Sequence, residues 1–132
     1  MIGLALAAAA CTPGLPPPTV GSPPFAGSST PVQDGNAHVA VLIGCAPAGA
    51  EVAAQIEPAQ LGGVYSDTYW LQVRAADGDP NFPAQIVRVE STDPVVTITA
   101  EPLDEATCIQ VLVQSIAYFD LPGKPFSYLV DW

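Results

Sequence analysis

The sequence has very few basic side chains, and this scarcity excludes several classes of protein. It holds three lysine and arginine residues against 13 aspartate and glutamate residues, which gives a formal net charge of −10. A surface with this charge repels a phosphate backbone and anionic lipid headgroups, so we expect no nucleic-acid partner. The acidity favours solubility and cationic partners instead.

Histidine occurs once, at His38, and this removes most of the usual catalytic arrangements. One histidine cannot form a two-histidine metal site, and no Gly-x-Ser-x-Gly context marks a nucleophile for a catalytic triad. The chain also lacks the glycine motifs of Walker and Rossmann nucleotide sites. We therefore expect a protein that is not an enzyme and needs no cofactor, with His38 as an ordinary residue on a strand face.

Long helical patterns are absent too, and short apolar runs take their place. Fifteen prolines and 11 glycines in 132 residues favour many turns. In several runs apolar and polar residues alternate, as in half-buried antiparallel strands. The sequence therefore predicts an all-β protein built as a single antiparallel sandwich of about seven strands. The runs cover residues 38–44, 51–56, 68–75, 85–90, 95–101, 108–119 and 126–132.

Composition divides the chain into three parts. Residues 1–10 are apolar, are shorter than the roughly 20 residues that span a bilayer, and resemble the hydrophobic part of a secretory signal. Residues 11–35 are rich in proline, glycine, serine and threonine. Because proline fixes φ and removes a hydrogen-bond donor, we expect a solvated tether that joins neither a helix nor a central strand. Residues 36–132 hold the apolar runs and form the predicted domain.

The end of the apolar segment, Ala8-Ala9-Ala10-Cys11, resembles the cleavage site of bacterial lipoprotein precursors. The resemblance implies that Cys11 carries a diacylglycerol, becomes the first residue of the mature protein and fastens it to the cell envelope. Contact with a membrane would then occur only through this lipid. Two other interpretations stay open, an ordinary secretory signal cut near Ala10 and an uncleaved structural segment.

Cys45 and Cys108 are the two cysteines left once Cys11 is set aside. In an exported protein such a pair usually forms a disulfide, and two buried free thiols are the alternative. Closing this loop of about 60 residues would stabilise the fold by up to roughly 4 kcal/mol. Cys108 shares the parity of Gln110 rather than that of Ile109, so it is expected near a strand end.

The order Cys45, Trp70, Cys108 is similar to that of immunoglobulin domains, and the domain resembles immunoglobulin and fibronectin type III sandwiches. Ala106 stands where immunoglobulin domains have a tyrosine, two residues before the second cysteine. The resemblance therefore implies an immunoglobulin-like architecture and nothing about a ligand.

Trp70 poses a choice between two registers of its strand. If the odd-numbered residues of the run 68–75 face the core, Trp70 is exposed beside Gln72 and Arg74. An indole flanked by hydrogen-bonding groups suits a sugar ring or a protein partner. In the opposite register Trp70 is buried in the core, which is the commoner place for tryptophan and the one that we favour.

One loop sequence is compatible with calcium. Asp77, Asp79 and Asn81 offer side-chain oxygens at alternate positions, as calcium loops do. An EF-hand needs glycine at position six and glutamate at position twelve, where this chain has Phe82 and Arg88. A looser calcium site formed with another loop is one interpretation, and a solvated turn between strands is the one that we favour.

Two functions fit these observations. The first is a secreted, lipid-anchored β-sandwich at the cell surface that acts as a non-catalytic binding or display module for an envelope or extracellular protein or a glycan. The alternative is a structural subunit of an extracellular or virion-like assembly. Its N-terminal arm and edge strands would then make the contacts between subunits by self-assembly.

Overall fold

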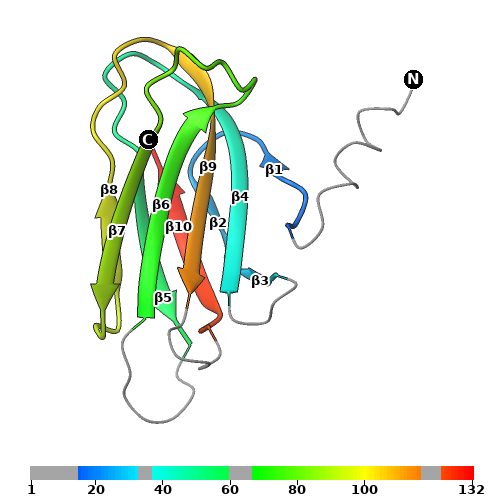
Figure 1. Cartoon of the computed structure of the whole chain (residues 1–132), viewed down its shortest axis with the longest axis vertical. Coiled ribbons are helices and arrows are strands. Elements are labelled where there is room, and N and C mark those ends of the chain that lie inside the picture. The colour runs from blue at the N-terminus through cyan, green and yellow to red at the C-terminus, as the bar shows by residue number, and fades with distance from the viewer. Residues whose placement is uncertain (1–14, 33–36, 60–66, 117–122) are drawn as a thin grey trace, which may run out of the picture.

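The computed structural model describes residues 15–32, 37–59, 67–116 and 123–132. These residues form two sheets that pack face to face, so the predicted all-β sandwich is confirmed (Figure 1). The described ranges contain no helix that is long and apolar enough to cross a membrane. The apolar segment and Cys11 lie outside the described residues.

Each of the predicted apolar runs corresponds to one strand. The turns between the strands use glycine where the backbone requires it, because Gly49 and Gly78 have φ of 83° and 77°. The strands are β4 (Ala37–Ala46), β5 (Ala53–Pro58), β6 (Asp67–Ala75), β7 (Gln85–Ser91), β8 (Val96–Thr99), β9 (Thr107–Ile116) and β10 (Phe126–Asp131).

Two sheets share these strands and enclose the main core. The large sheet has the order β1-β4-β9-β6-β7, with β3 also paired to β4, and the small sheet has the order β2-β10-β5-β8. All pairs are antiparallel except the short parallel pair of β1 and β4. The largest side chains that are fully buried are Tyr69, Leu42, Ile56, Leu71, Ile98, Ile109, Val39, Val52, Val73, Val111, Val113 and Val130.

The order of the strands differs from that of an immunoglobulin domain. Immunoglobulin constant domains place strands A, B, E and D in one sheet and C, F and G in the other. If β4 to β10 are matched to A to G, the pairs C–F and B–E are kept as β6–β9 and β5–β8. The first and last strands are exchanged, because β4 lies beside β9 and β10 lies beside β5. The architecture is therefore a sandwich, with a topology of its own.

Residues 19–31 are mostly exposed, as expected of a solvated segment, but they do not form a separate tether. This segment forms β1 (Thr19–Val20), β2 (Phe25–Ser28) and β3 (Thr30–Pro31). β1 and β3 pair with the free edge of β4, while β2 pairs with the free edge of β10. The three strands, together called the arm, lie along one side of the sandwich in Figure 1. The prolines keep the arm out of central positions, as expected, but they allow short edge strands.

Phe25 is the residue that fixes the arm to the sandwich. Its side chain is 7% exposed, belongs to the main core and lies with its ring centroid 5.4 Å from that of Trp132. Gly44 makes room for this contact, because a Cβ atom there would lie 2.7 Å from the Trp132 ring. The folded unit therefore begins well before residue 36.

A second, smaller apolar cluster lies on the outer face of the large sheet. It consists of Val39, Val41 and Leu112, with Val32 packed against it. Val39 and Val41 alternate along β4 with Leu42, which points into the main core. This explains why β4 is apolar on both faces rather than on one.

Candidate functional site

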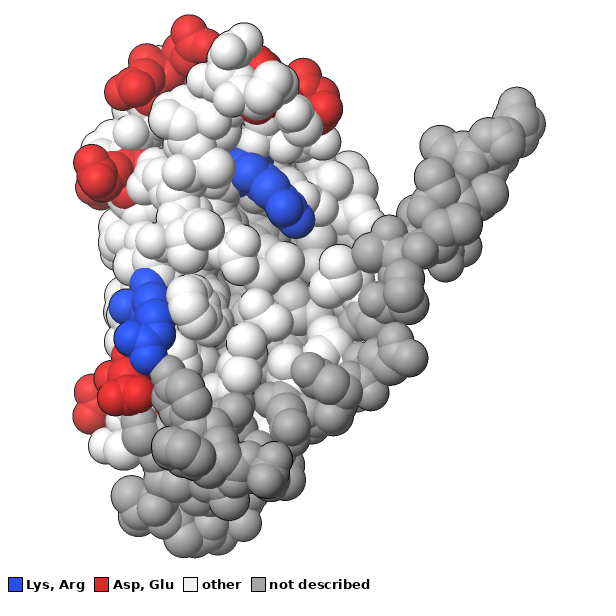
Figure 2. Space-filling view, viewed as in Figure 1, with Lys and Arg blue, Asp and Glu red and all other residues white. Residues whose placement is uncertain are grey.

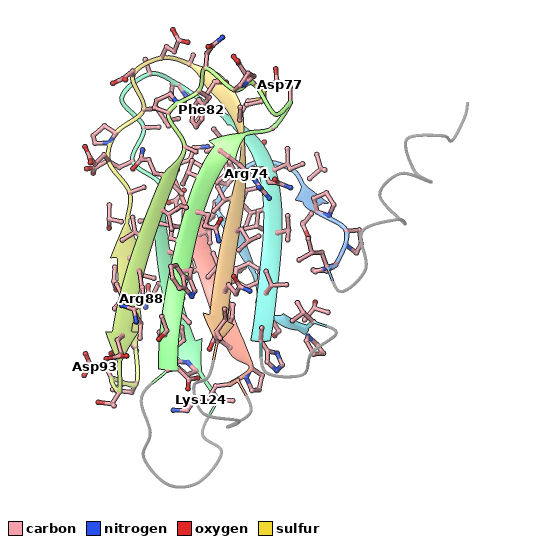
Figure 3. The ribbon with its side chains drawn as sticks, viewed as in Figure 1. Arg74, Asp77, Phe82, Arg88, Asp93 and Lys124 are labelled. Carbon is pink, nitrogen blue, oxygen red and sulfur yellow. A yellow bond between two sulfur atoms is a disulfide. The ribbon has the colours of Figure 1, made fainter. Side chains whose placement is uncertain are left out.

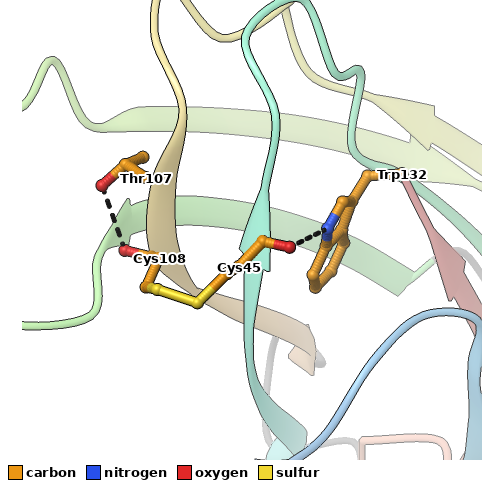
Figure 4. Close-up of a disulfide and its surroundings, with 4 residues drawn as sticks. All are labelled: Cys45, Thr107, Cys108 and Trp132. Carbon is orange, nitrogen blue, oxygen red and sulfur yellow. Dashed lines mark hydrogen bonds between the residues drawn. A yellow bond between two sulfur atoms is a disulfide. The ribbon is translucent and has the colours of Figure 1, made fainter.

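A disulfide joins Cys45 and Cys108, as predicted (Figure 4). The two residues are direct partners on the neighbouring strands β4 and β9, and both are exposed. The bond therefore lies within one sheet, whereas the immunoglobulin bond crosses from sheet to sheet through the core. Cys108 is the second residue of β9, which agrees with its expected place near a strand end. Trp132 Nε1 donates a hydrogen bond of 3.4 Å to the Cys45 carbonyl.

The register of β6 places Trp70 on the outer face of the large sheet. Tyr69, Leu71 and Val73 are buried in the main core. Trp70, Gln72 and Arg74 point the other way, so the favoured interpretation of Trp70 as a core residue is wrong. The three residues that were considered as a partner surface do lie on one face.

Arg88 lies over the Trp70 indole and so limits the access of a ligand to the ring. It is the partner of Trp70 on β7, and its guanidinium carbon lies 5.7 Å from the centroid of the indole, a cation–π arrangement. Its Nη2 also lies 3.9 Å from Glu90 Oε2. Because Arg88 covers the indole, a sugar ring would have to displace this guanidinium before it stacked on Trp70.

The same face carries few charged side chains (Figure 2). In Figure 2 the side turned to the viewer is largely uncharged, and Figure 3 labels Arg74 and Arg88 on it. Arg74 Nε donates a hydrogen bond of 2.8 Å to Gln110 Oε1 on β9. Ile86 on β7 is 65% exposed. The face therefore combines amide, guanidinium and apolar groups that can contact a partner.

The calcium candidates lie in the loop between β6 and β7. Asp77 Oδ1 accepts a hydrogen bond of 3.0 Å from the amide of Asp79, and Asp79 Oδ1 accepts one of 2.9 Å from the amide of Asn81. These are local turns, in which each carboxylate serves its own loop. Among the described residues no group of three His, Cys, Asp or Glu side chains is suited to hold a metal ion.

A hollow of about 600 Å³ lies at the same end of the sandwich, between the β6–β7 and β8–β9 loops. We call it the loop-end hollow. Leu103, which is 5% exposed and belongs to the main core, contributes to its wall together with the half-buried Phe82. The rim is acidic, and Figure 2 shows the acidic side chains gathered at this end. The acidic residues that line the hollow are Asp77, Asp79, Glu101, Asp104 and Glu105.

Sequence reasoning missed this hollow because its two loops are far apart in the chain. The β6–β7 loop was examined for calcium alone, and the β8–β9 loop carried no motif. A combined signal did exist, since both loops are rich in acidic residues and proline. Only the pairing of β5 with β8 and of β6 with β9 brings the loops to the same end.

His38 lies on β4, half-buried, as a strand-face residue. Its Nδ1 is 3.3 Å from Ser29 Oγ at the junction of β2 and β3. Ser29 Oγ also accepts a hydrogen bond of 2.9 Å from the amide of Phe126 on β10. Burial lowers the pKa of His38, because the charged imidazolium loses contact with water. His38 therefore connects the arm to the sandwich and has no described catalytic partner.

Comparison with known protein families and with curated sequences gives no match for the chain.

Proposed function

We propose that the protein is an exported, non-catalytic binding or display module, held at the cell envelope by a lipid on Cys11. The observation that carries the proposal is the exposed disulfide of Cys45 and Cys108. Disulfides persist in oxidising compartments and are rare in the cytosol. The bond therefore supports export. The lipoprotein-like sequence before Cys11 would supply the export signal, and the lipid on Cys11 the anchor.

The described surface supports binding. The outer face of the large sheet carries Gln72, Arg74 and the Trp70–Arg88 pair, a mixture of groups that is common where proteins contact partners. An envelope or extracellular protein suits this face better than a glycan does, because the indole is already covered by a guanidinium. Loops at the ends of a sandwich are the other usual place for recognition.

The experiment is an intact-mass measurement on the membrane fraction of a bacterial host that expresses the full chain. We expect a species that begins at Cys11 and is heavier by a diacylglycerol, and we expect this species to be lost in Cys11→Ser. The two other cysteines should resist thiol-blocking reagents until they are reduced. An unmodified mass for the whole chain in the membrane fraction would disprove the anchor.

A second candidate function is a subunit of an extracellular assembly, and one observation favours it. The arm occupies free edges of both sheets through short pairs with β4 and β10. The same edges would accept the arm of a second copy, which is the geometry of strand exchange. Sedimentation of the Cys11→Ser chain separates the candidates, since a monomer supports the binding module and large particles support the assembly.

A further inference from the structure

We propose that the loop-end hollow binds a peptide segment of a partner protein that carries lysine or arginine. This inference rests on the binding role proposed above and names the site and the partner chemistry. The hollow has a volume of about 600 Å³, inside the range of roughly 300–1,000 Å³ that is usual for ligand sites.

The charge of the hollow is not compensated within the chain. All of the ionisable residues that line it are acidic. The chain has three basic side chains in total, and none of them lines the hollow. Arg74 is bonded to Gln110, Arg88 lies over Trp70, and Lys124 is at the opposite end of the molecule (Figure 3). A cationic group is therefore drawn to the hollow and meets no competing cation there.

The walls of the hollow favour a peptide over a bare ion. Phe82, Pro83 and Pro102 line the hollow together with its acidic residues, and the nearly fully buried Leu103 lies in its wall. A metal ion gains nothing from such walls. Lysine and arginine combine a terminal charge with an aliphatic stem that packs on apolar surface. This combination matches a lining that holds both acidic and apolar side chains.

The two loops that form the hollow are fixed before any partner arrives. Gln85 bridges them, because its Nε2 donates to the Glu101 carbonyl at 2.9 Å and its Oε1 accepts from the Glu101 amide at 2.7 Å. Leu103 is held on its other side by backbone hydrogen bonds with Gly49 and Ala50. Binding therefore orders little new structure, and this lowers its entropic cost.

The test uses the full chain with Cys11→Ser and a capped hexapeptide of alternating lysine and leucine as the probe. Amide shifts measured by NMR at low salt should move at residues 77–85 and 101–107, and the affinity should fall as salt rises. A capped hexapeptide of alternating glutamate and leucine is the matched control. It should not change the chemical shifts of these residues. Shifts that move only on the outer face of the large sheet would overturn the inference.

Two double variants that remove the same number of negative charges separate the effect of the hollow from the effect of the protein's net charge. Asp104→Asn with Glu105→Gln should weaken binding of the lysine peptide about three- to tenfold. Glu57→Gln with Asp93→Asn makes the same change of charge outside the hollow and should have little effect. All four side chains are exposed, so both variants should fold. Equal weakening by the two variants would show general charge attraction and overturn the site.

Calcium chloride is titrated as a separate probe. The inference predicts that calcium produces no saturable shifts at residues 77–85 at millimolar concentration. Calcium binding at this loop without peptide binding would replace the peptide site with a metal site. A chain that carries the lipid and ignores the peptide would overturn this inference while the proposed anchoring and export stand.

Discussion

At the scale of single residues, Asp67 is the least expected side chain in the core. Its exposure is 0%, and its Oδ2 accepts hydrogen bonds of 3.2 Å from Ser115 Oγ and from the amide of Lys124. Its Oδ1 has no hydrogen-bond partner in the part of the chain that the structure describes. Asp67 thus joins the start of β6 to β9 and to the segment before β10.

We predict that Asp67→Ala lowers the free energy of unfolding by about 1–3 kcal/mol, because it leaves the buried Ser115 hydroxyl and the Lys124 amide without an acceptor. Asp67→Asn keeps one acceptor in the same place and carries no charge, so it should lower the free energy of unfolding by less. Urea denaturation followed by tryptophan fluorescence measures both. A loss for asparagine that equals the loss for alanine would contradict this account.

Trp70 shows why the sequence left its register open. Alternation along the run predicted that Tyr69 and Trp70 lie on opposite faces, and this is confirmed. On the outer face the indole lies under Arg88, which belongs to another strand. A cross-strand partner of this kind cannot be found from the period of one run, because the period says nothing about which strands are neighbours.

At the scale of elements, the prolines of the arm predict correctly that it stays out of the sheet centres, but they do not predict that it pairs with the sheet edges. Proline at position 31 agrees with a segment outside the sheet centres. The error lay in treating the segment as separate from the sheets, because its strands pair with β4 and β10 although most of their residues are exposed. Phe25 is the only aromatic residue of the arm, and its burial depends on contacts with Trp132 and with the main core, which are distant in the chain.

We predict that Phe25→Ala releases the arm before the rest of the sandwich unfolds. Truncation of a buried phenylalanine to alanine typically lowers the free energy of unfolding by about 3–5 kcal/mol. Because the arm can detach locally, we expect a value near the lower end of this range. Limited proteolysis should then cut within residues 15–32 and leave a stable fragment. Val20→Ala is the control, because Val20 is 73% exposed and its loss should stay within about 0.5 kcal/mol. Equal proteolysis of the two variants would contradict the role of Phe25.

At the scale of the whole molecule, the fold class followed from the spacing of apolar runs and turns, while the topology did not. Each run predicted one strand, but the bounds differ by one or two residues in places, as in β5 (Ala53–Pro58 against 51–56) and β8 (Val96–Thr99 against 95–101). The exchange of the first and last strands between the sheets depends on contacts such as Phe126 with Pro58, which are distant in the chain. The disulfide was predicted from cysteine count, but its place within one sheet was not.

We predict that Cys45→Ala with Cys108→Ala lowers the free energy of unfolding by up to about 4 kcal/mol, because the bond closes a loop between residues 63 positions apart. The native pairing of β4 with β9 should persist, since it has ten residue pairs. The midpoint of urea unfolding measures the loss, and Cys11→Ser is the control. A double variant as stable as the oxidised protein would show that the bond does not constrain the unfolded chain.

The place of this disulfide also decides how the molecule would respond to tension. Every residue that lines the loop-end hollow falls between Cys45 and Cys108 in the sequence, whereas the arm and β10 fall outside. A pull on the two ends of the chain is carried across the covalent bridge and cannot stretch the segment that it closes. A pull on the two ends of the chain would therefore release the arm and the last strand first, and the bridged segment could not be drawn out.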